Sequence, residues 1–393
     1  MKIGIFTNNY LPNPYGVANS IESFRRQFEK LGHTVYIFAP RTKGYTDQNP
    51  NVFRYPSIDI KYKISFPLAI PYSRRISKIL EKLDLDIIHS QHPTLLGKTA
   101  MKWARRKKIP LVLTWHTLHE HYVHFAPLVP KKLAIWWINR KAVKYANRCD
   151  AVVTPTESVK KIIQDLGVIN ENIIPIPTGV EEEFYQNTNR NLIRKKYNIS
   201  DDEILLLLVS RLTAEKNIEF LFRAIIRVLK LANNSKFLVA GEGHLVPKLK
   251  SMVKDNDMKN RVIFVGVVDK KEIKNYYAAA DIFVYASKSE TQGMIISEAM
   301  YAGLPIVAVN ATGSKDLVED SVNGFLVPED ENKFAEAVSK LVGNAELRRK
   351  FGENSAGIAR EKYTDKVCAQ RMLEIYAAAL KHKKKPHTFR SGL

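Results

Sequence analysis

Short runs of apolar and β-branched residues alternate with longer segments of helical apolar spacing along the whole chain. Strands and helices that alternate in this way build parallel sheets with helices on both faces. The strand-like runs are apolar at nearly every position, which is typical of strands buried on both sides. Ten such runs stand out: Ile3–Phe6, Thr34–Phe38, Ile87–His89, Leu111–Thr114, Ala151–Thr154, Leu205–Val209, Lys236–Ala240, Val262–Val265, Ile282–Tyr285 and Ile306–Val309.

The length of the chain, 393 residues, exceeds what one hydrophobic core usually supports, roughly 250–300 residues. About five predicted strands fall in each half, so we predict an α/β protein of two Rossmann-like domains. We place the boundary after a strand near Ile173–Pro177, which gives domains of residues 1–179 and 180–364. A helix predicted from Asp365 to Leu380 follows, and we expect residues 365–393 to pack back on the first domain.

Basic residues are concentrated in the first part of the chain. The formal net charge is +21, and residues 1–150 carry 25 Lys and Arg against 9 Asp and Glu. A balance this basic indicates an acidic partner: nucleic acid, an anionic membrane surface or a phosphorylated substrate. The asymmetry predicts a basic face on the N-terminal domain.

Cysteine content and hydropathy limit the class of protein. Two cysteines exclude a disulfide scaffold and a Cys-rich metal fold, and they fit a reducing compartment. No apolar run approaches the roughly 20 residues of a membrane-spanning helix. The chain starts with a strand-like segment rather than a signal peptide. We therefore expect a cytoplasmic protein, either soluble or peripheral on a membrane.

Two glutamates eight residues apart, Glu290 and Glu298, lie in the most informative segment. We expect Glu290 in the loop after the strand Ile282–Tyr285, and Glu298 about one turn into the next helix. Gly293 precedes that helix, so the N–H groups of Met294 and Ile295 would face an anion at a helix N-terminus. Two glutamates alone are better explained by a surface loop and an ordinary amphipathic helix.

The segment as a whole resembles the Glu-x7-Glu motif of the retaining glycosyltransferases of family 4, because Gly293, Ala299, Gly303 and Pro305 stand in register. The resemblance implies the GT-B fold, two Rossmann-like domains with parallel sheets facing across a cleft. It also implies that the C-terminal domain binds a nucleotide sugar. In that family the first glutamate orients the sugar hydroxyls and the second the ribose.

A second segment, Ser210–Asn217, matches the family directly after the strand Leu205–Val209. The resemblance places Arg211 and Lys216 on the donor diphosphate. The chemistry agrees, because arginine grips phosphate with a fork and lysine adds a point charge. An isolated Arg and Lys five residues apart are more typical of a solvated surface.

Glycine loops supply further predicted donor contacts. Gly241 and Gly243 follow a strand, and alone they indicate a tight turn without the dinucleotide fingerprint. The resemblance puts this loop beside the nucleotide and the strand edge at Val262 near the base. Many family members carry two glycines below the donor phosphate where this chain has Tyr15 and Gly16, so only Gly16 is assigned to the donor.

His116 follows the strand Leu111–Thr114, and the resemblance places it near the reactive carbon of the donor sugar. A lone histidine after a strand is usually structural. His119, His121 and His124 follow closely, and a zinc site is one interpretation of this cluster. The spacing lacks a His-Glu-x-x-His pattern and nearby cysteines, so we expect no metal and prefer acceptor-cleft lining or polar surface.

A helix predicted from Pro130 to Arg148 combines an apolar arc with an opposite arc that is basic and partly apolar. A basic face that carries tryptophan and leucine is typical of a helix lying on anionic lipid. The alternative is a solvated helix face. The predicted membrane-binding residues are Leu133, Trp137, Arg140, Lys141, Lys144 and Arg148, and Arg74, Arg75, Lys78, Lys82, Lys102 and residues 105–108 extend the patch.

Three segments narrow the resemblance within the family. Ile3–Pro12, Trp115–Tyr122 and Ser289–Gly293 are similar to those of bacterial diacylglycerol α-glucosyltransferases. The resemblance implies transfer of a hexose, glucose from UDP-glucose, to 1,2-diacylglycerol at the inner face of the cell membrane. The implied transfer reaction requires no metal or other cofactor. The predicted catalytic residues are His116, Glu290, Arg211 and Lys216.

Two other functions stay open at this point. The acceptor could be a soluble sugar, a phosphatidylinositol-like lipid or a polysaccharide. A nucleic-acid-binding protein would also use a basic face, but it leaves the Glu-x7-Glu segment unexplained and the chain carries no recognised nucleic-acid motif. We therefore expect no nucleic-acid partner.

Overall fold

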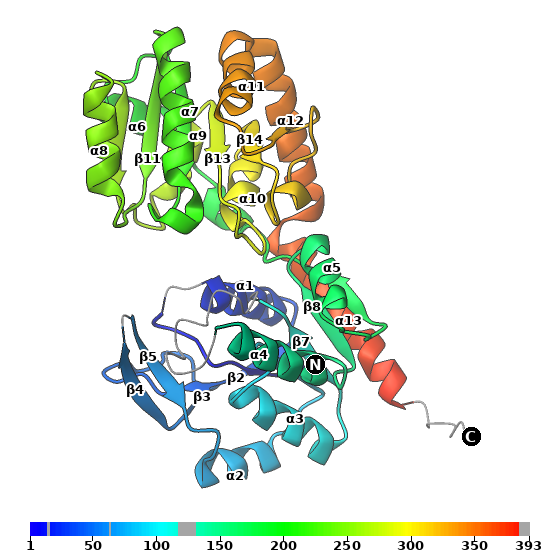
Figure 1. Ribbon diagram of the computed structural model, residues 1–393. Coiled ribbons are helices and arrows are strands. Elements are labelled where there is room, and N and C mark those ends of the chain that lie inside the picture. The colour runs from blue at the N-terminus through cyan, green and yellow to red at the C-terminus, as the bar shows by residue number, and fades with distance from the viewer. Residues whose placement is uncertain (14–15, 63, 117–130, 385–393) are drawn as a thin grey trace. The chain divides into compact units, whose positions relative to one another are not determined.

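The computed structural model describes residues 1–13, 16–62, 64–116 and 131–384 (Figure 1). The chain divides into two compact units, of which the first combines Met1–Thr178 with the segment from Cys368 on, and the second is Gly179–Val367. Tyr15, Pro130 and the histidines at 119, 121 and 124 lie outside the described residues. No helix in the described ranges is long and apolar enough to cross a membrane.

The first unit is built on a seven-stranded parallel sheet with the strand order β3-β2-β1-β6-β7-β8-β9. A separate antiparallel hairpin, β4–β5, follows β3 along the chain. The strands are β1 Lys2–Phe6, β2 Thr34–Pro40, β3 Val52–Tyr55, β4 Ser57–Tyr62, β5 Ile64–Ala69, β6 Ile87–Ser90, β7 Leu111–Thr114, β8 Ala151–Thr154 and β9 Ile173–Pro175.

Helices cover both faces of this sheet. The last helix of the chain, α13, contributes Cys368, Met372 and Tyr376 to the same buried cluster as Ile3 and Ile5 of β1. Helix α13 therefore completes the core of the first unit. The helices are α1 Gly16–Lys30, α2 Arg74–Lys82, α3 Leu96–Lys107, α4 Lys131–Ala146, α5 Glu157–Asp165 and α13 Asp365–Lys384.

The second unit has a six-stranded parallel sheet with the order β12-β11-β10-β13-β14-β15. Its strands are β10 Ile204–Val209, β11 Ser235–Ala240, β12 Val262–Gly266, β13 Ile282–Tyr285, β14 Ile306–Val309 and β15 Gly324–Val327. Its helices are η2 Glu182–Tyr185, α6 Arg190–Lys196, η3 Ala214–Lys216, α7 Ile218–Leu231, α8 Val246–Asp255, α9 Ile273–Ala279, α10 Met294–Tyr301, η4 Ser314–Asp316, α11 Glu331–Gly343 and α12 Ala345–Lys362.

Side-chain alternation divides the core of each sheet between its two faces. In β7, Val112 belongs to the cluster on one face, and Leu111 and Leu113 belong to the cluster on the other. Leu205 to Leu208 of β10 are all fully buried, as the continuous apolar run predicts. The predicted α/β fold with two parallel sheets is confirmed, and each of the ten predicted strands is present.

Four strands were not predicted. β3 and β15 have four residues each and are mostly half-buried, so their apolar signal is weak. β4 and β5 alternate apolar and other residues, a pattern that differs from the continuous runs of the main sheets.

Candidate active site

Lys216 and Glu290 meet at the carboxyl edge of the second unit's sheet. Lys216 ends η3 after β10, and Glu290 lies in the loop after β13, the neighbour of β10. In parallel sheets, ligands bind at this edge. The Lys216 Nζ donates a hydrogen bond to Glu290 Oε1, and the side chains are only 13% and 18% exposed. Two of the four predicted catalytic residues are therefore in direct contact.

Glu290 is held in its charged form. Burial alone would raise the pKa of Glu290, but the Lys216 ammonium and the hydroxyl of Tyr285 hold that pKa below its usual range. Tyr285, the last residue of β13, donates its hydroxyl to the same carboxylate oxygen as Lys216. The remaining oxygen can accept hydrogen bonds from hydroxyl groups, as a sugar-orienting carboxylate must.

Gly313 supports Glu290 from the loop after β14. A Cβ on Gly313 would lie 2.7 Å from the Glu290 Cβ and 2.9 Å from the Glu290 carbonyl oxygen, and the φ of Gly313 is +86°. Its N–H donates to the Asp316 carboxylate at 3.2 Å. Only glycine fits this approach. The sequence analysis missed both Tyr285 and Gly313, although each follows or ends a predicted strand.

Gly293 begins helix α10 with a φ of +75°. The N–H groups of Met294 and Ile295 lie in the first turn, where helical hydrogen bonds do not satisfy them. The helix starts at Met294, four residues after Glu290, so its positive end lies at the edge that holds the Lys216–Glu290 pair. Anion binding at this helix start stays a prediction.

Glu298 differs from Glu290 in its surroundings. It lies inside α10 and accepts a hydrogen bond of 2.9 Å from the hydroxyl of Tyr277. Burial raises the pKa of Glu298, and the hydrogen bond from Tyr277 only partly offsets this rise. The two glutamates of one motif thus have opposite pKa shifts.

Arg211 is more exposed than Lys216, because its side chain is 70% exposed and that of Lys216 is 13% exposed. It pairs with Glu215 at 3.2 Å, one helical turn along the chain. An exposed pair of this kind contributes only about 0–1 kcal/mol. Arg211 therefore lies near the edge without being fixed to Glu290.

The glycines of the loop after β11 pack against the loop after β10. A Cβ on Gly241 would lie 1.8 Å from the Ser210 carbonyl oxygen, and one on Gly243 would lie 2.1 Å from that of Leu212. The Leu212 N–H donates to the Glu242 carbonyl at 2.9 Å. This close contact between backbones accounts for both glycines, and their contact with a nucleotide stays a prediction.

Val262 lies apart from these residues. It begins β12, pairs with Phe237 and is buried, so it sits at the amino end of its strand. Gly266 ends β12 and accepts a hydrogen bond of 2.8 Å from the Gly241 N–H. The next residue, Val267, is 78% exposed. The part of β12 beside the glycine loop is therefore its carboxyl end, and the sequence pattern alone did not distinguish the two ends.

His116 lies in the first unit, just beyond β7. Its Nε2–H donates to the amide oxygen of Gln91 at 2.5 Å, and Gln91 follows the neighbouring strand β6. Burial, together with nearby His89, lowers the pKa of His116 to about 3. The imidazole is therefore neutral at physiological pH, with Nδ1 as its acceptor.

A buried network underlies His116. His89 forms hydrogen bonds with the Tyr376 hydroxyl of α13 at 2.6 Å and with the Thr114 hydroxyl at 2.7 Å. Burial lowers the pKa of His89 to about 3. Gln91, His89 and Tyr376 were not predicted, because their partners are far away in sequence.

Gly16 is the first residue of α1. No heavy atom of the described chain lies within 4 Å of a Cβ placed on it. Packing therefore does not require glycine at this position, in contrast to Gly241 and Gly243. The open space leaves room for the predicted donor contact.

Helix α4 exposes an aromatic and basic face. Leu133, Trp136 and Trp137 are 55%, 54% and 53% exposed, although Trp136 was not predicted. The guanidinium of Arg140 lies 5.2 Å from the Trp136 ring centroid, and the ammonium of Lys141 lies 3.1 Å from that of Trp137. Lys144 and Arg148 are also exposed. The opposite face buries Ala134, Ala142, Tyr145 and Ala146.

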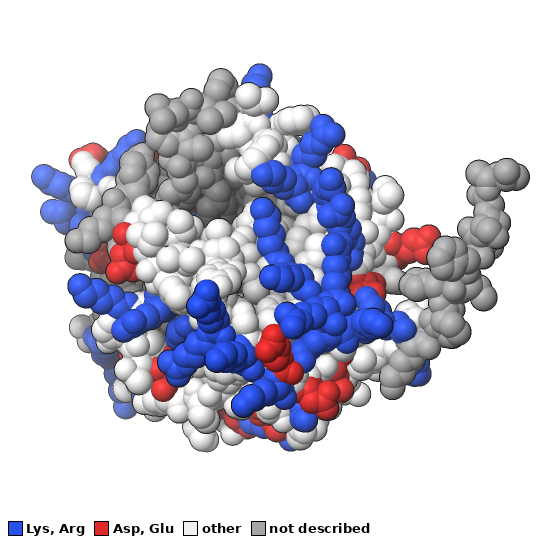
Figure 2. Space-filling model, turned by 90° about the horizontal axis from the view of Figure 1, so that it is seen from below, with Lys and Arg blue, Asp and Glu red and all other residues white. Residues whose placement is uncertain are grey.

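Basic side chains also cover the underside of the first unit. Figure 2 shows Lys and Arg gathered across the face seen from below, with few Asp and Glu among them. Helices α2 and α3 lie at this side in Figure 1. The exposed cations of these helices are Arg74, Arg75, Lys78, Lys82, Lys98, Lys102, Arg105 and Arg106.

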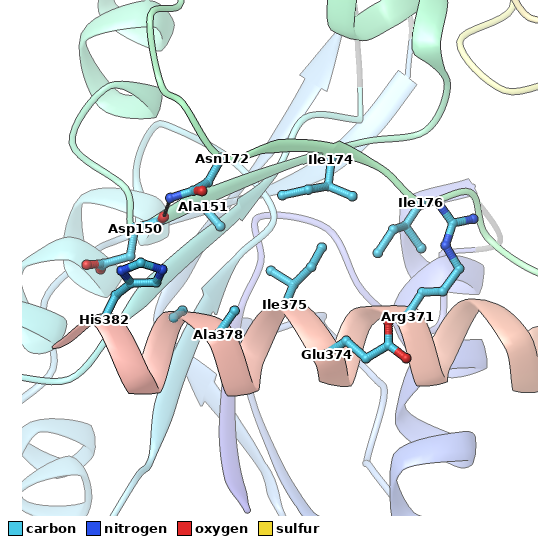
Figure 3. A pocket seen from close by; sticks show the side chains of 11 residues that line it. Asp150, Ala151, Asn172, Ile174, Ile176, Arg371, Glu374, Ile375, Ala378 and His382 are labelled. Atoms are coloured by element: carbon cyan, nitrogen blue, oxygen red, sulfur yellow. Dashed lines mark hydrogen bonds between the residues drawn. The ribbon is translucent and has the colours of Figure 1, made fainter. Parts of the chain in front are cut away.

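A cavity of about 270 Å³ lies between α13 and strands β8 and β9 (Figure 3). Ile174, Ile176 and Ile375 form its apolar wall, and Asp150, Arg371 and His382 stand at its rim. None of the predicted donor or catalytic residues lines it. The described residues also hold no group of three or more His, Cys, Asp or Glu side chains able to bind a metal ion.

Models of glycosyltransferase families match both halves of the chain. The family model "Glycosyltransferase Family 4" matches residues 14–184, and "Glycosyl transferases group 1" matches residues 189–357. The alpha-monoglucosyldiacylglycerol synthase of Acholeplasma laidlawii is 32% identical over 96% of each chain. The enzyme of the same name from Streptococcus pneumoniae is 34% identical, over 83% of this chain and 75% of the relative.

The fold also has solved counterparts. The crystal structure of Anabaena HepE in complex with UDP and glucose superposes with a TM-score of 0.74. It covers 96% of this chain and 100% of the other, at 20% identity. At that identity the similarity establishes the fold.

Proposed function

This chain belongs to glycosyltransferase family 4, and we propose that it transfers glucose from UDP-glucose to 1,2-diacylglycerol at a membrane surface, with retention of the α-anomer. The product is an α-monoglucosyl diacylglycerol. The similarity to two alpha-monoglucosyldiacylglycerol synthases, which extends over 96% of both chains for one of them, supports this choice of donor and acceptor.

The observation that carries the transfer reaction is the buried contact between Lys216 and Glu290. As the bond between the sugar carbon and the diphosphate breaks, negative charge grows on the diphosphate. Lys216, Arg211 and the N–H groups at the start of α10 stabilise that charge, and Lys216 and the N–H groups are already oriented before the reaction. These groups take the place of a divalent cation, so the reaction uses no metal.

Glu290 and Glu298 bind hydroxyl groups in this proposal. Glu290 is ionised beside Lys216 and accepts hydrogen bonds from the sugar hydroxyls. Glu298 accepts them from the ribose. Because glycine has no side chain, Gly16, Gly241 and Gly243 let the backbone approach the donor closely. The loop after β12 lies nearest the base.

His116 acts at the reacting sugar from the first unit. Its neutral ring and its backbone stabilise the positive charge that develops on the sugar without repelling it. The acceptor hydroxyl attacks from the side of the leaving group. The new bond joins the acceptor oxygen to the sugar carbon, and the acceptor's proton passes to the departing phosphate.

Diacylglycerol lies in a bilayer, so the enzyme must bind a membrane surface. Helix α4 supports this part of the proposal, because Leu133, Trp136 and Trp137 are exposed among Arg140, Lys141 and Lys144. Tryptophan favours the membrane interface, and each lysine or arginine near an anionic surface contributes about 1 kcal/mol. The proposed location is the inner face of the cell membrane.

The deciding experiment measures transfer from a panel of radiolabelled nucleotide sugars into diacylglycerol, with anionic vesicles and EDTA present. We expect a glycolipid product from UDP-glucose. Donor hydrolysis without a lipid product would keep the enzyme class and overturn the acceptor. Soluble sugars, phosphatidylinositol-like lipids and polysaccharides would then be tested in the same assay.

The membrane contact has its own test. Replacing Trp137, Lys141 and Lys144 together by alanine should weaken binding to phosphatidylglycerol vesicles at least tenfold, since two cations and one aromatic ring are lost. Binding of UDP should not change. Unchanged vesicle affinity would move the membrane contact away from α4.

A further inference from the structure

The hairpin β4–β5 has one face directed at the body of the first unit. Ser57 pairs with Ala69 in the register, so both side chains share a face. The Ser57 hydroxyl donates to the Arg41 carbonyl at 2.5 Å, and Ala69 is only 3% exposed. This face is therefore packed against the protein.

The other face of the hairpin is aliphatic and exposed. Ile58 pairs with Leu68 one residue farther along, so both lie opposite Ser57 and Ala69. Ile70 continues the row, because its N–H donates to the Pro56 carbonyl at 2.7 Å. Ile58 is 59% exposed and Ile70 is 39% exposed, while Leu68 is half-buried. Contiguous exposed apolar residues of this kind mark interaction surfaces.

Cations border this aliphatic row. Tyr72, which is 65% exposed, follows Ile70, and its hydroxyl accepts a hydrogen bond of 3.3 Å from Arg74 Nε. Helix α2 begins at Arg74, buries Ile76 and Leu80, and exposes Arg74, Arg75, Lys78 and Lys82. An apolar row, a tyrosine and a row of cations thus follow one another along a continuous stretch of chain.

We propose that the row formed by Ile58, Leu68, Ile70 and Tyr72 inserts into the interface of an anionic bilayer, with the cations of α2 on the lipid headgroups. This hairpin contact is additional to α4, and it rests on the proposed membrane-bound acceptor. Binding is favoured when isoleucine side chains leave water and when arginine and lysine side chains lie beside lipid phosphates. A bilayer interface offers both within a few ångströms.

Charge argues against the other occupants of this face. A second copy would bring another N-terminal segment with 25 basic and 9 acidic residues against the first, and the two would repel. Nucleic acid would attract the cations of α2. It would leave Ile58 and Ile70 without an apolar partner.

A site-specific probe tests the hairpin contact directly. Cys149 and Cys368 are both buried, so a cysteine introduced by Ile58→Cys can be labelled selectively with the environment-sensitive dye NBD. We expect a blue shift and an increase in emission on adding phosphatidylglycerol vesicles, and little change with phosphatidylcholine vesicles. The matched control is Leu231→Cys, since Leu231 is 83% exposed in the second unit and should give no response.

Binding measurements give a second readout. Ile58→Glu combined with Ile70→Glu should weaken sedimentation with phosphatidylglycerol vesicles at least about tenfold, because two apolar insertions are lost and two charges repel the surface. Leu231→Glu should leave binding unchanged. Both variants replace exposed side chains, so circular dichroism should be that of the unmodified protein.

The outcomes separate this inference from the proposed function. Vesicle binding without any NBD response at position 58 would overturn the hairpin contact and leave α4 as the membrane site. An NBD response that depends on protein concentration in the absence of vesicles would identify a second copy as the occupant and also overturn it. A response to vesicles in a protein that does not glucosylate diacylglycerol would support the hairpin contact and refute the acceptor.

Discussion

At the carboxyl edge of the second unit's sheet, Lys216 and Glu290 meet as an ion pair, whereas at the same edge of the first unit's sheet His116 and Gln91 meet as two neutral groups. Both sheets are parallel and both sites follow adjacent strands, so the fold does not cause the difference. The difference comes from the residues that follow the strands. In the proposed mechanism the charged edge holds the diphosphate, and the neutral His116 does not repel a carbon that becomes positive.

The largest effect on the transfer rate is expected at the charged edge, the carboxyl edge of the second unit's sheet where Lys216 and Glu290 lie. Lys216→Ala or Glu290→Ala should lower the rate of glucose transfer by roughly 10²–10³-fold, because each removes a preorganised contact to the donor. The control is Lys288→Ala, since Lys288 lies two residues from Glu290 but pairs with Glu329 on the surface. Near-normal turnover of Glu290→Ala would exclude its proposed role.

The neutral edge, where His116 and Gln91 meet in the first unit, can be given a charge by one substitution. Gln91→Glu would place a carboxylate on the Nε2–H of His116 and raise the pKa of His116 above its present value of about 3. The unmodified enzyme should show no ionisation step from His116 between pH 5 and pH 8. The variant should lose about tenfold in transfer rate once the ring is charged, since that charge repels the developing positive carbon.

The control for that prediction keeps the ring neutral. Gln91→Met removes the hydrogen bond without adding charge, so it should lower the rate by a factor that does not depend on pH. A pH step of equal size in both variants would contradict the assignment of a neutral His116.

The two glutamates of one motif should respond oppositely to pH, with changes of about 1–2 kcal/mol in the free energy of unfolding. The folded pKa of Glu290 is lowered, so its contribution is present above the unfolded pKa and is lost as pH falls through the folded one. Glu290→Gln should therefore destabilise the protein at pH 7, and the loss should shrink in acid.

For Glu298 the sign is reversed. Its folded pKa is raised, so stability from this group is present below the unfolded pKa and falls as pH rises through the folded one. Glu298→Gln should be neutral or stabilising at pH 7 and lose that advantage below about pH 4.5. Thermal unfolding of both variants from pH 4 to pH 8 measures this; parallel curves would refute the opposite shifts.

The smallest expected effect is that of chelation. EDTA should leave the transfer rate unchanged, because in the proposed mechanism Lys216 and the start of α10 take the role that a cation has in other enzymes. A loss of activity that Mg²⁺ restores would show that the charged edge is incomplete without metal.

Most strands and the positions of Glu290 and Lys216 could be predicted from the sequence, because apolar runs and local spacing determine them. The short or alternating strands β3, β4, β5 and β15 could not. Partners that come from elsewhere in the chain could not. Gly313 reaches Glu290 from the next loop, and Gln91 reaches His116 from a neighbouring strand. The opposite pKa shifts of Glu290 and Glu298 depend on burial and on such partners, so the motif alone did not reveal them.

Strand direction bears on the predicted contact at Val262. The family resemblance placed this strand edge near the base, whereas the register of β12 puts the carboxyl end of the strand at Gly266, beside Gly241. The contact of Val262 with the base stays a prediction. On α4, helical spacing identified Leu133 and Trp137 and missed Trp136, which lies at the border of the predicted arc.

Helix α13 has a consequence for synthesis on the ribosome. The core of the first unit needs Cys368, Met372 and Tyr376, which follow the whole of the second unit in the chain. The second unit is one continuous segment and can fold as soon as it emerges. The part of the chain made first must therefore wait for a helix made after residue 364, which reverses the usual order in which domains fold during translation.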